Sequence, residues 1–191
     1  MPVTTLDPKT ALVVIDLQNG VTALPGEPHA TPDVIAKTVE LAEAFRKRNL
    51  LVVLVRVSIA ADGADWVPGR TEQPRRSARQ AQPGADQIVD QLAGHADDII
   101  VTKRNWGAFH GTDLDLHLRR RGITQIVLTG IATSIGVEST ARAAFEHGYH
   151  VTLATDAMTD MSADAHENSL TRIFPRLGET GTTAEILTLL D

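Results

Sequence analysis

The sequence predicts an α/β fold, a three-layer α/β/α sandwich built around a parallel sheet. Apolar, β-branched runs recur at residues 11–15, 50–55, 99–101, 125–128 and 150–153. These runs are continuous rather than alternating, as in strands that are covered on both faces. Stretches with helical periodicity separate them, and each connection is long enough for a right-handed parallel crossover.

The first two helices are marked by residues that favour helix ends. The first is expected to start at Thr31 as N-cap, with Pro32 at the first helical position, and to finish before Asn49. The second is expected to be capped by Thr112 and to stop at Gly122. Arginines fill its last turn, where cations interact favourably with the helix dipole.

The third helix follows a glycine-flanked turn after the fourth apolar run. Its apolar stripe is predicted to comprise Val137, Ala141, Ala144 and Phe145, because these residues recur at helical spacing. Gly148 is expected to end the helix, since glycine adopts the left-handed conformation that commonly follows a helix C-terminus.

Two more helices are expected near the C-terminus, one from Ser162 to about Phe174 and a short one after Thr183. The least regular segment is residues 59–84, and a loop of that length in a compact domain is usually a lid or a binding loop. The sequence contains no internal repeat and no domain boundary, so residues 1–191 are expected to form a single domain.

Composition and charge narrow the possible classes of function. The 191 residues have a formal net charge of −6 and include no cysteine. The acidic balance argues against nucleic acid as a partner, and no apolar run approaches the ~20 residues of a membrane-spanning helix. The N-terminus shows no export or transit signal, so we expect a soluble, cytoplasmic protein. The absence of cysteine excludes disulfides, thiolate metal sites and cysteine nucleophiles.

Two charged residues end predicted strands at the edge where open parallel sheets bind ligands. Asp16 follows the first apolar run and Lys103 follows the third. Burial of Asp16 should raise its pKa toward the range of a general acid or base, while the Lys103 ammonium would stabilise negative charge. Trp106 and Phe109 come soon after Lys103 and are expected to line the pocket. Gln18, two residues after Asp16, is expected to line it as well.

The turn from Gly130 to Gly136 ends the fourth strand. Amides of Ile135, Gly136 and Val137 at the start of the following helix would form an anion or oxyanion site. Ser134 is the hydroxyl at the tip of this turn, and a serine nucleophile is an open alternative. The spacing matches neither a phosphate loop nor a dinucleotide-binding fingerprint.

The histidines do not form a metal-binding pattern at a strand end. His117, His147 and His166 fall within predicted helices, where we expect solvated or capping side chains rather than ligands. The sequence therefore predicts no catalytic metal and no cofactor, and a small molecule as the partner.

Four long segments together resemble the isochorismatase-like hydrolase superfamily over nearly the whole chain. They are VVIDLQNG at 13–20, VTKRNWGAFHGTDLDLHLRRRGI at 101–123, VLTGIATSIGVESTARAAFEHGYHVTLATDAMTD at 127–160 and AHENSLTRIFPRLGE at 165–179. The resemblance implies a six-stranded parallel sheet in the order 3-2-1-4-5-6 and a homo-oligomeric assembly.

The resemblance also implies a role for each matching position. Asp16 and Lys103 match the acid and the lysine of the family site, and the nucleophilic cysteine of its amidohydrolases would fall at Gly136. The peptide between Ile131 and Ala132 is expected to be cis and to shape the oxyanion pocket together with Ser134, Ile135 and Gly136.

Two classes of function follow from this resemblance. Isochorismatases dispense with the cysteine and hydrolyse a vinyl ether, so the chain could act on a small anionic metabolite with Asp16 as general acid and Lys103 as electrostatic partner. The turn at 130–134 is closer to that of the cysteine amidohydrolases, so the chain could instead be a non-catalytic relative that binds a small molecule.

Overall fold

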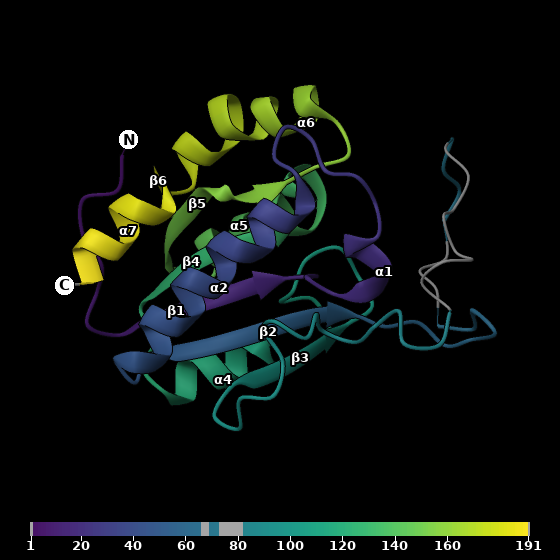
Figure 1. Ribbon diagram of the computed structural model, residues 1–191, viewed down its shortest axis with the longest axis horizontal. Helices are drawn as coiled ribbons and strands as arrows, with labels where there is room; N and C mark the ends of the chain where they lie inside the picture. The colour runs from purple at the N-terminus through teal and green to yellow at the C-terminus, as the bar shows by residue number, and fades with distance from the viewer. Residues whose placement is uncertain (1, 66–68, 73–81, 191) are drawn as a thin grey trace.

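Six parallel strands form one sheet in the order β3-β2-β1-β4-β5-β6 in the computed structural model, which describes residues 2–65, 69–72 and 82–190 (Figure 1). This confirms the predicted fold class and strand order. The strands are β1 (Thr10–Ile15), β2 (Leu51–Val57), β3 (Ile99–Lys103), β4 (Gln125–Ile131), β5 (His150–Thr159) and β6 (Glu179–Gly181).

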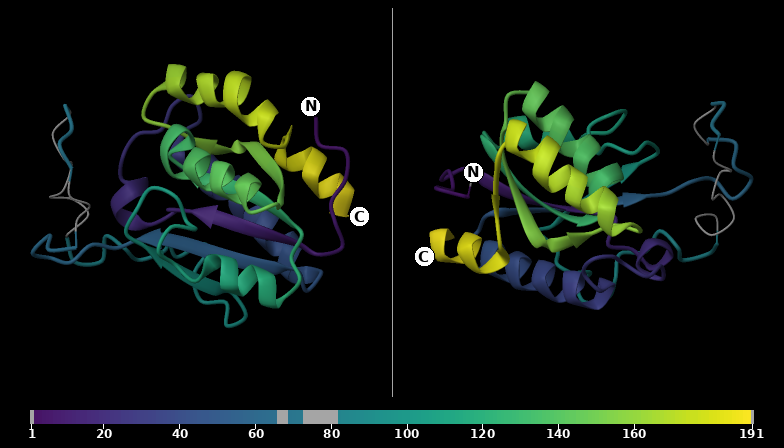
Figure 2. Two further views of the ribbon diagram at one scale, coloured as in Figure 1. Left: turned by 180° about the vertical axis from the view of Figure 1, so that it is seen from behind. Right: turned by 90° about the horizontal axis from the view of Figure 1, so that it is seen from above.

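Helices cover both faces of the sheet, as Figure 2 shows from above. One face packs against α2 (Thr31–Lys47) and α7 (Thr183–Leu190). The other packs against α4 (Leu114–Arg120), α5 (Glu138–Glu146) and the helical segment that leads to Phe174. This segment comprises α6 (Ala163–Asn168), the π-helical turn η2 (Ser169–Ile173) and the 3-10 turn η3 (Phe174–Arg176). None of the described helices is both long and apolar enough to cross a membrane.

The central strand shows why the apolar runs are continuous. Ala11, Val13 and Ile15 of β1 point into the core beneath α4 and α5, whereas Leu12 and Val14 point into the core beneath α2. All of them are at most 1% exposed. Burial of both faces removes any reason for polar residues to alternate with apolar ones.

Helix α2 begins one residue earlier than expected. Its N-cap is Ala30, so the expected N-cap Thr31 is the first helical residue, and its hydroxyl donates to the carbonyl of Leu24. The end of the helix is as predicted, because Asn49 follows in the left-handed conformation with φ of 57°.

The N-cap of α4 also differs by one residue from the expected one. It is Asp113, although the hydroxyl of Thr112 accepts a hydrogen bond from the amide of Leu114 at 3.2 Å and so satisfies one free donor of the first turn. Gly122 follows the helix with φ of 66°, as predicted for its stop.

The stripe predicted for the third helix is correct except at Phe145. Val137, Ala141 and Ala144 are fully buried on the inner face of this helical segment, but Phe145 is 52% exposed. With 3.6 residues per turn, Phe145 lies about 80° around the axis from Val137, at the margin of the apolar face. The C-terminal helices agree with expectation, since Ser162 caps α6 through a bond from the Ala165 amide and α7 starts at Thr183.

The loop predicted at 59–84 is only partly described, because residues 66–68 and 73–81 lie outside the described ranges. Its first part is held to the sheet by an ion pair between Asp65 and Arg104 at 2.7 Å. The carboxyl ends of β1, β2 and β3 point toward this loop and toward the short helix α1 (Asn19–Thr22) (Figure 1).

Candidate active site

Asp16 and Lys103 meet at the carboxyl end of the sheet. Asp16 directly follows β1 and Lys103 ends β3, with β2 lying between the two strands. The Lys103 Nζ is 2.7 Å from the Asp16 Oδ2, and both side chains are buried. The structure therefore brings together the two residues that the sequence singled out.

The backbone at Asp16 is held in an unusual conformation. Its φ is 52°, in the left-handed region that non-glycine residues rarely adopt and that costs about 1–2 kcal/mol. Two hydrogen bonds fix it there, from the Asp16 amide to the carbonyl of Val55 at 2.9 Å and from the Gln18 amide to the carbonyl of Asp16 at 2.8 Å. Strained backbone of this kind clusters at functional sites.

The carboxyl of Asp16 has one oxygen engaged and one without a partner. Burial raises the pKa of Asp16, and this effect outweighs the opposing influence of Lys103. Lys103 also donates to the carbonyl of Asn105 at 3.1 Å. The Asp16 Oδ1, in contrast, is buried with no hydrogen-bond partner among the described residues. A buried carboxyl oxygen of this kind can hold a proton or receive a donor from a ligand.

The strand β4 approaches the site through glycine. A Cβ at Gly130, whose φ is 116°, would lie only 2.0 Å from the carbonyl oxygen of Ile15. The peptide between Ile131 and Ala132 that follows is cis, as expected from the family resemblance. The chain then enters the π-helical turn η1 (Thr133–Val137), which leads into α5.

Gly136 in this turn faces Asp16. A Cβ at Gly136 would lie 3.5 Å from the Asp16 Oδ2 and 3.0 Å from the Cγ2 of Ile15. The place predicted for the family nucleophile is therefore adjacent to the buried ion pair.

Two of the turn amides that were predicted to bind an anion instead donate hydrogen bonds within the turn. The amides of Ile135 and Val137 both donate to the carbonyl of Ala132 at 3.1 Å. The Ser134 amide donates to the Asp160 Oδ2 at 2.6 Å. The π-helical geometry pairs residues five apart, and such a turn was not expected from the sequence.

Gln18 joins three segments of the chain through its side-chain amide. Its Nε2 donates to the carbonyls of Val57 at 2.8 Å and Ala85 at 3.0 Å, while its Oε1 accepts from the amide of Val57 at 2.7 Å. This fully satisfied amide ties the end of β2 and the chain around residue 85 to the end of β1.

The two aromatic residues after Lys103 lie in different surroundings. Trp106 is 68% exposed, so it lies at the surface. Phe109 was expected to line the pocket, but it is buried in the core, where its ring stacks on His147 with centroids 5.1 Å apart.

The structure shows three polar residues behind the turn that sequence reasoning missed. Thr133 Oγ1 lies 2.8 Å from His166 Nδ1, and Asp160 binds the Ser134 amide as described above. His166 was expected to be a solvated or capping residue, yet it is only 2% exposed. Leu170 and Ile173 follow His166 at helical spacing and pack against the core, and this apolar stripe could have indicated that His166 faces inward.

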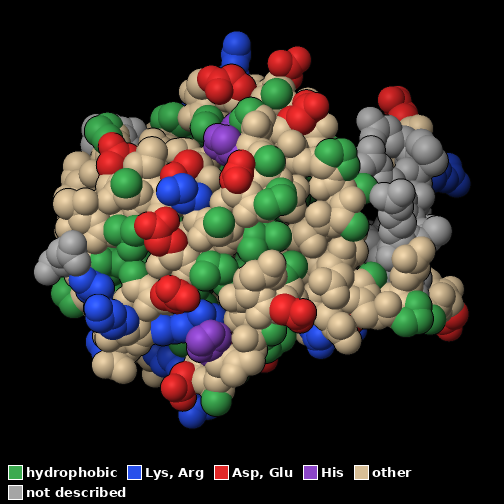
Figure 3. Space-filling model, viewed as in Figure 1, with side chains coloured by type: hydrophobic (Ala, Val, Ile, Leu, Met, Phe, Trp, Pro, Cys, Tyr) green, Lys and Arg blue, Asp and Glu red, His purple; other side chains and the backbone are tan. Residues whose placement is uncertain are grey.

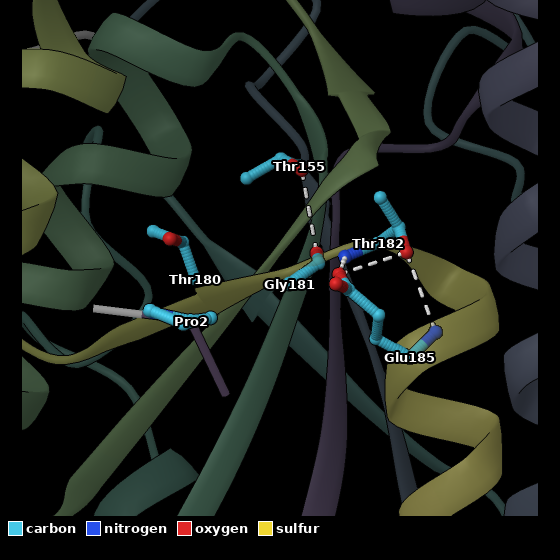
Figure 4. A pocket seen from close by; sticks show the side chains of 6 residues that line it. All are labelled: Pro2, Thr155, Thr180, Gly181, Thr182 and Glu185. Carbon is cyan, nitrogen blue, oxygen red and sulfur yellow. Dashed lines mark hydrogen bonds between the residues drawn. The ribbon is translucent and has the colours of Figure 1, made fainter. Parts of the chain in front are cut away.

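Two surface hollows lie away from this site. One of about 350 Å³ is lined by Pro2, Thr155, Thr180, Gly181, Thr182 and Glu185 beside β6 (Figure 4). The other, of about 440 Å³, adjoins Phe145, Tyr149 and the start of β5. In the first hollow the Glu185 carboxylate accepts from Thr182 at the start of α7, which is the pattern of a helix cap. We therefore assign the chemistry to the buried pair rather than to these hollows.

Charged side chains in the described part of the chain form no metal-binding cluster. Acidic and basic side chains are interspersed on the face shown in Figure 3. Within residues 2–65, 69–72 and 82–190, no three histidine, aspartate or glutamate side chains converge where they could hold a metal ion.

Comparison with known proteins gives a consistent family. The model of the isochorismatase domain matches residues 10–185. Isochorismatase family protein YwoC of Bacillus subtilis strain 168 is 48% identical over 181 residues, which are 94% of this chain and 93% of the relative. Isochorismatase family protein YecD of Escherichia coli O157:H7 is 45% identical, with 95% and 96% covered. The structure of an isochorismatase family protein from Burkholderia thailandensis superimposes with a TM-score of 0.93 at 50% identity, covering 97% of each chain. The chain therefore belongs to the isochorismatase family.

Proposed function

We propose that this chain is a hydrolase of the isochorismatase type, acting on a small anionic metabolite without a covalent intermediate. Asp16 is the general acid and Lys103 its electrostatic partner. The observation that carries the proposal is the carboxyl of Asp16, which is buried beside Lys103 with Oδ1 unpartnered and with its pKa raised by burial. Because burial raises its pKa, such a carboxyl holds a proton more readily than an exposed aspartate and can deliver that proton to a substrate.

The proposed reaction is hydrolysis of an enol-pyruvyl ether. The proton of Asp16 adds to the terminal methylene carbon. The π electrons of the double bond form the new C–H bond, so an oxocarbenium ion remains at the ether carbon. Water adds to that carbon and returns a proton to the Asp16 carboxylate. The resulting hemiketal breaks its bond to the ether oxygen while its hydroxyl proton passes to that oxygen, releasing an alcohol and pyruvate. The Lys103 ammonium attracts the substrate carboxylate and steadies the Asp16 anion after proton transfer.

Gly136 supports a mechanism without a nucleophile. The chain contains no cysteine, and a side chain at Gly136 would occupy space beside Asp16. Because glycine has no side chain, this space beside Asp16 is left to the substrate. Ser134 is a weaker candidate for a nucleophile, because the buried His166 pairs with Thr133 rather than with Ser134.

A second candidate function is small-molecule binding without turnover. It is favoured by the turn amides of Ile135 and Val137, which donate to Ala132 and so are not directed at an oxyanion. Either function takes a small molecule as partner, and homo-oligomeric assembly and a cytoplasmic location stay predictions of the sequence.

A product screen separates these functions. The intact protein is incubated with isochorismate, other vinyl ethers, amides and ureido acids, and products are detected by mass. We expect pyruvate from the vinyl ethers, with a rate that falls by about 10²–10⁴-fold in Asp16→Asn, the usual contribution of a general acid. Asp97→Asn, an exposed acid ahead of β3, is the matched control and should retain the rate. Saturable binding with no turnover across the panel would reject the hydrolase and favour the binding protein.

A further inference from the structure

Two buried side chains from the segment after β5 support the turn that faces Asp16. Thr133 and Ser134 are consecutive residues at the start of η1. The first bonds His166 through its hydroxyl at 2.8 Å, and the second bonds Asp160 through its amide at 2.6 Å. We propose that His166 and Asp160 are positioning residues, which act through Thr133 and Ser134 to hold the turn in register with Asp16. This inference rests on the proposed function for its catalytic meaning, but its geometry can be tested without a substrate.

Burial makes these contacts consequential. Thr133 is fully buried, and His166 and Asp160 are 2% and 3% exposed. The second oxygen of Asp160 accepts from the amide of Met161 at 2.8 Å, so the carboxylate is fixed at both ends. A polar group left unpaired in such surroundings is destabilising, which gives the turn a strong preference for this arrangement.

The turn has an unusual geometry. The π-helix is rare and occurs mostly as single turns within α-helices, frequently at functional sites, and here it places Gly136 three residues after Thr133. A displacement of about 1 Å at a reacting centre can lower a rate by 10²-fold. A tether at the first residues of the turn therefore controls the distance between Gly136 and Asp16.

A third segment, residues 27–29, contacts both His166 and Asp160. The His29 ring lies edge-on to the His166 ring, with centroids 5.3 Å apart, and its Nδ1 donates to the carbonyl of Met158 at 2.9 Å. The backbone of Glu27 exchanges two hydrogen bonds with that of Asp160 at 2.8 and 3.0 Å. His166 is thus enclosed by ordered neighbours, and its ring has little freedom to leave Thr133.

The charged and titratable groups around His166 are His29, Asp160 and Glu167. Burial and His29 lower the pKa of His166, whereas the two carboxylates oppose this effect. A neutral imidazole is thereby favoured, and it can accept a hydrogen bond from the Thr133 hydroxyl through Nδ1, whereas a protonated ring can only donate.

A single thiol can report the position of the turn. The chain has no cysteine, so Gly136→Cys introduces a unique thiol next to Asp16. Its alkylation by iodoacetamide is followed as a function of pH, first alone and then with Thr133→Val or His166→Leu added. The thiol pKa and the plateau rate depend on the distance to the Asp16 and Lys103 charges, so a merely structural loss elsewhere does not change them.

We expect Thr133→Val and His166→Leu each to change the plateau rate of alkylation by about threefold or more, or to shift its pH midpoint, because each loosens the turn. Thr133→Ser retains the hydroxyl and should restore the original profile. The combination of Thr133→Val with His166→Leu should change the alkylation profile no more than either substitution alone, because each removes the same hydrogen bond. Tyr149→Phe removes a 2.7 Å hydrogen bond to Asp115 far from the turn and is the matched control.

Superimposable profiles in all folded variants would overturn the proposal, as would an equal change in Tyr149→Phe. If His166→Leu does not fold, His166→Asn replaces it, because the amide can still bond Thr133 and should leave the profile close to the original. A large change in His166→Asn with none in Thr133→Val would also overturn it. The thiol assay requires no turnover, so its outcome is distinct from a failure of the proposed hydrolase activity.

Discussion

The Cβ position of Gly136 lies 3.5 Å from the Asp16 Oδ2, so any side chain there would share space with the buried ion pair. The nearest atom is the Cγ2 of Ile15 at 3.0 Å, a methyl group on the Cβ of a buried β-branched side chain, so it can yield by only a few tenths of an ångström. We expect Gly136→Cys to fold at a cost of about 1 kcal/mol, which in a chain of 191 residues lowers the melting temperature by about 2–4 °C. We expect its vinyl-ether hydrolysis to fall about tenfold or more, because the thiol occupies substrate space.

The same variant distinguishes the two functional accounts. Pyruvate release and amide hydrolysis are measured in parallel for wild type and Gly136→Cys. A gain of amide hydrolysis, with no vinyl-ether activity in either protein, would show a lapsed amidohydrolase site and contradict the proposed reaction.

Lys103 sets the pH at which Asp16 loses its proton. Its ammonium lowers the pKa of Asp16 against the larger, opposite effect of burial. Lys103→Met removes the charge but retains an unbranched side chain of similar length, so we expect the pKa of Asp16 to rise further. The carboxyl ¹³C shift of Asp16, followed by NMR across a pH titration, measures this directly. An unchanged or lower midpoint would show that the pair is not electrostatically coupled.

The close approach of β4 to β1 predicts a large effect at one glycine. Gly130→Ala would place a Cβ 2.0 Å from the carbonyl oxygen of Ile15, at a φ of 116° that alanine rarely adopts. Backbone must move, so the free energy of unfolding should fall by about 3 kcal/mol or more. Gly122→Ala is the matched control: its φ is 66°, no atom lies within 4 Å of its Cβ position, and its cost should be about 1–2 kcal/mol. Urea unfolding compares the two, and equal losses would mean that steric contact is not the cause.

The position of Asp16 and Lys103 could be predicted because it depends only on strand direction. In a parallel sheet the carboxyl ends of strands share one edge, so residues that follow β1 and β3 meet there whatever the details of packing. The turn at Gly130 was visible for a similar reason, since glycine next to a buried strand signals a close backbone approach.

Other features of the site depend on contacts between distant segments. Gln18 bonds Val57 and Ala85, and Phe109 stacks on His147, so the orientation of each is set by partners that strand and helix periodicity do not specify. His166 is the clearest case. The spacing to Leu170 and Ile173 indicates the helix face on which it lies, but its partner Thr133 comes from a distant segment that this spacing does not specify.

His166 also predicts how stability depends on pH. Burial, reinforced by His29, lowers the pKa of His166 in the folded state below the value of about 6.5 for an exposed histidine. At pH above 6.5 neither the folded nor the unfolded chain protonates this residue. As pH falls below ~6.5 the unfolded chain binds a proton that the folded chain resists, so the free energy of unfolding decreases by up to about 1.4 kcal/mol per pH unit. This loss ends once pH passes below the folded-state pKa.

His166→Asn isolates this contribution from the other titrating groups. The asparagine cannot titrate but can still bond Thr133, so unfolding free energies of the two proteins should run parallel above pH 7 and diverge below ~6.5, where wild type loses stability faster. Urea denaturation at half-unit pH steps from 5 to 8 measures the difference. His117→Asn, which alters a histidine paired with Asp113 on the surface of α4, is the matched control for the loss of a histidine elsewhere in the fold. A wild-type curve that stays parallel to His166→Asn down to pH 5 would contradict a neutral buried imidazole at this position.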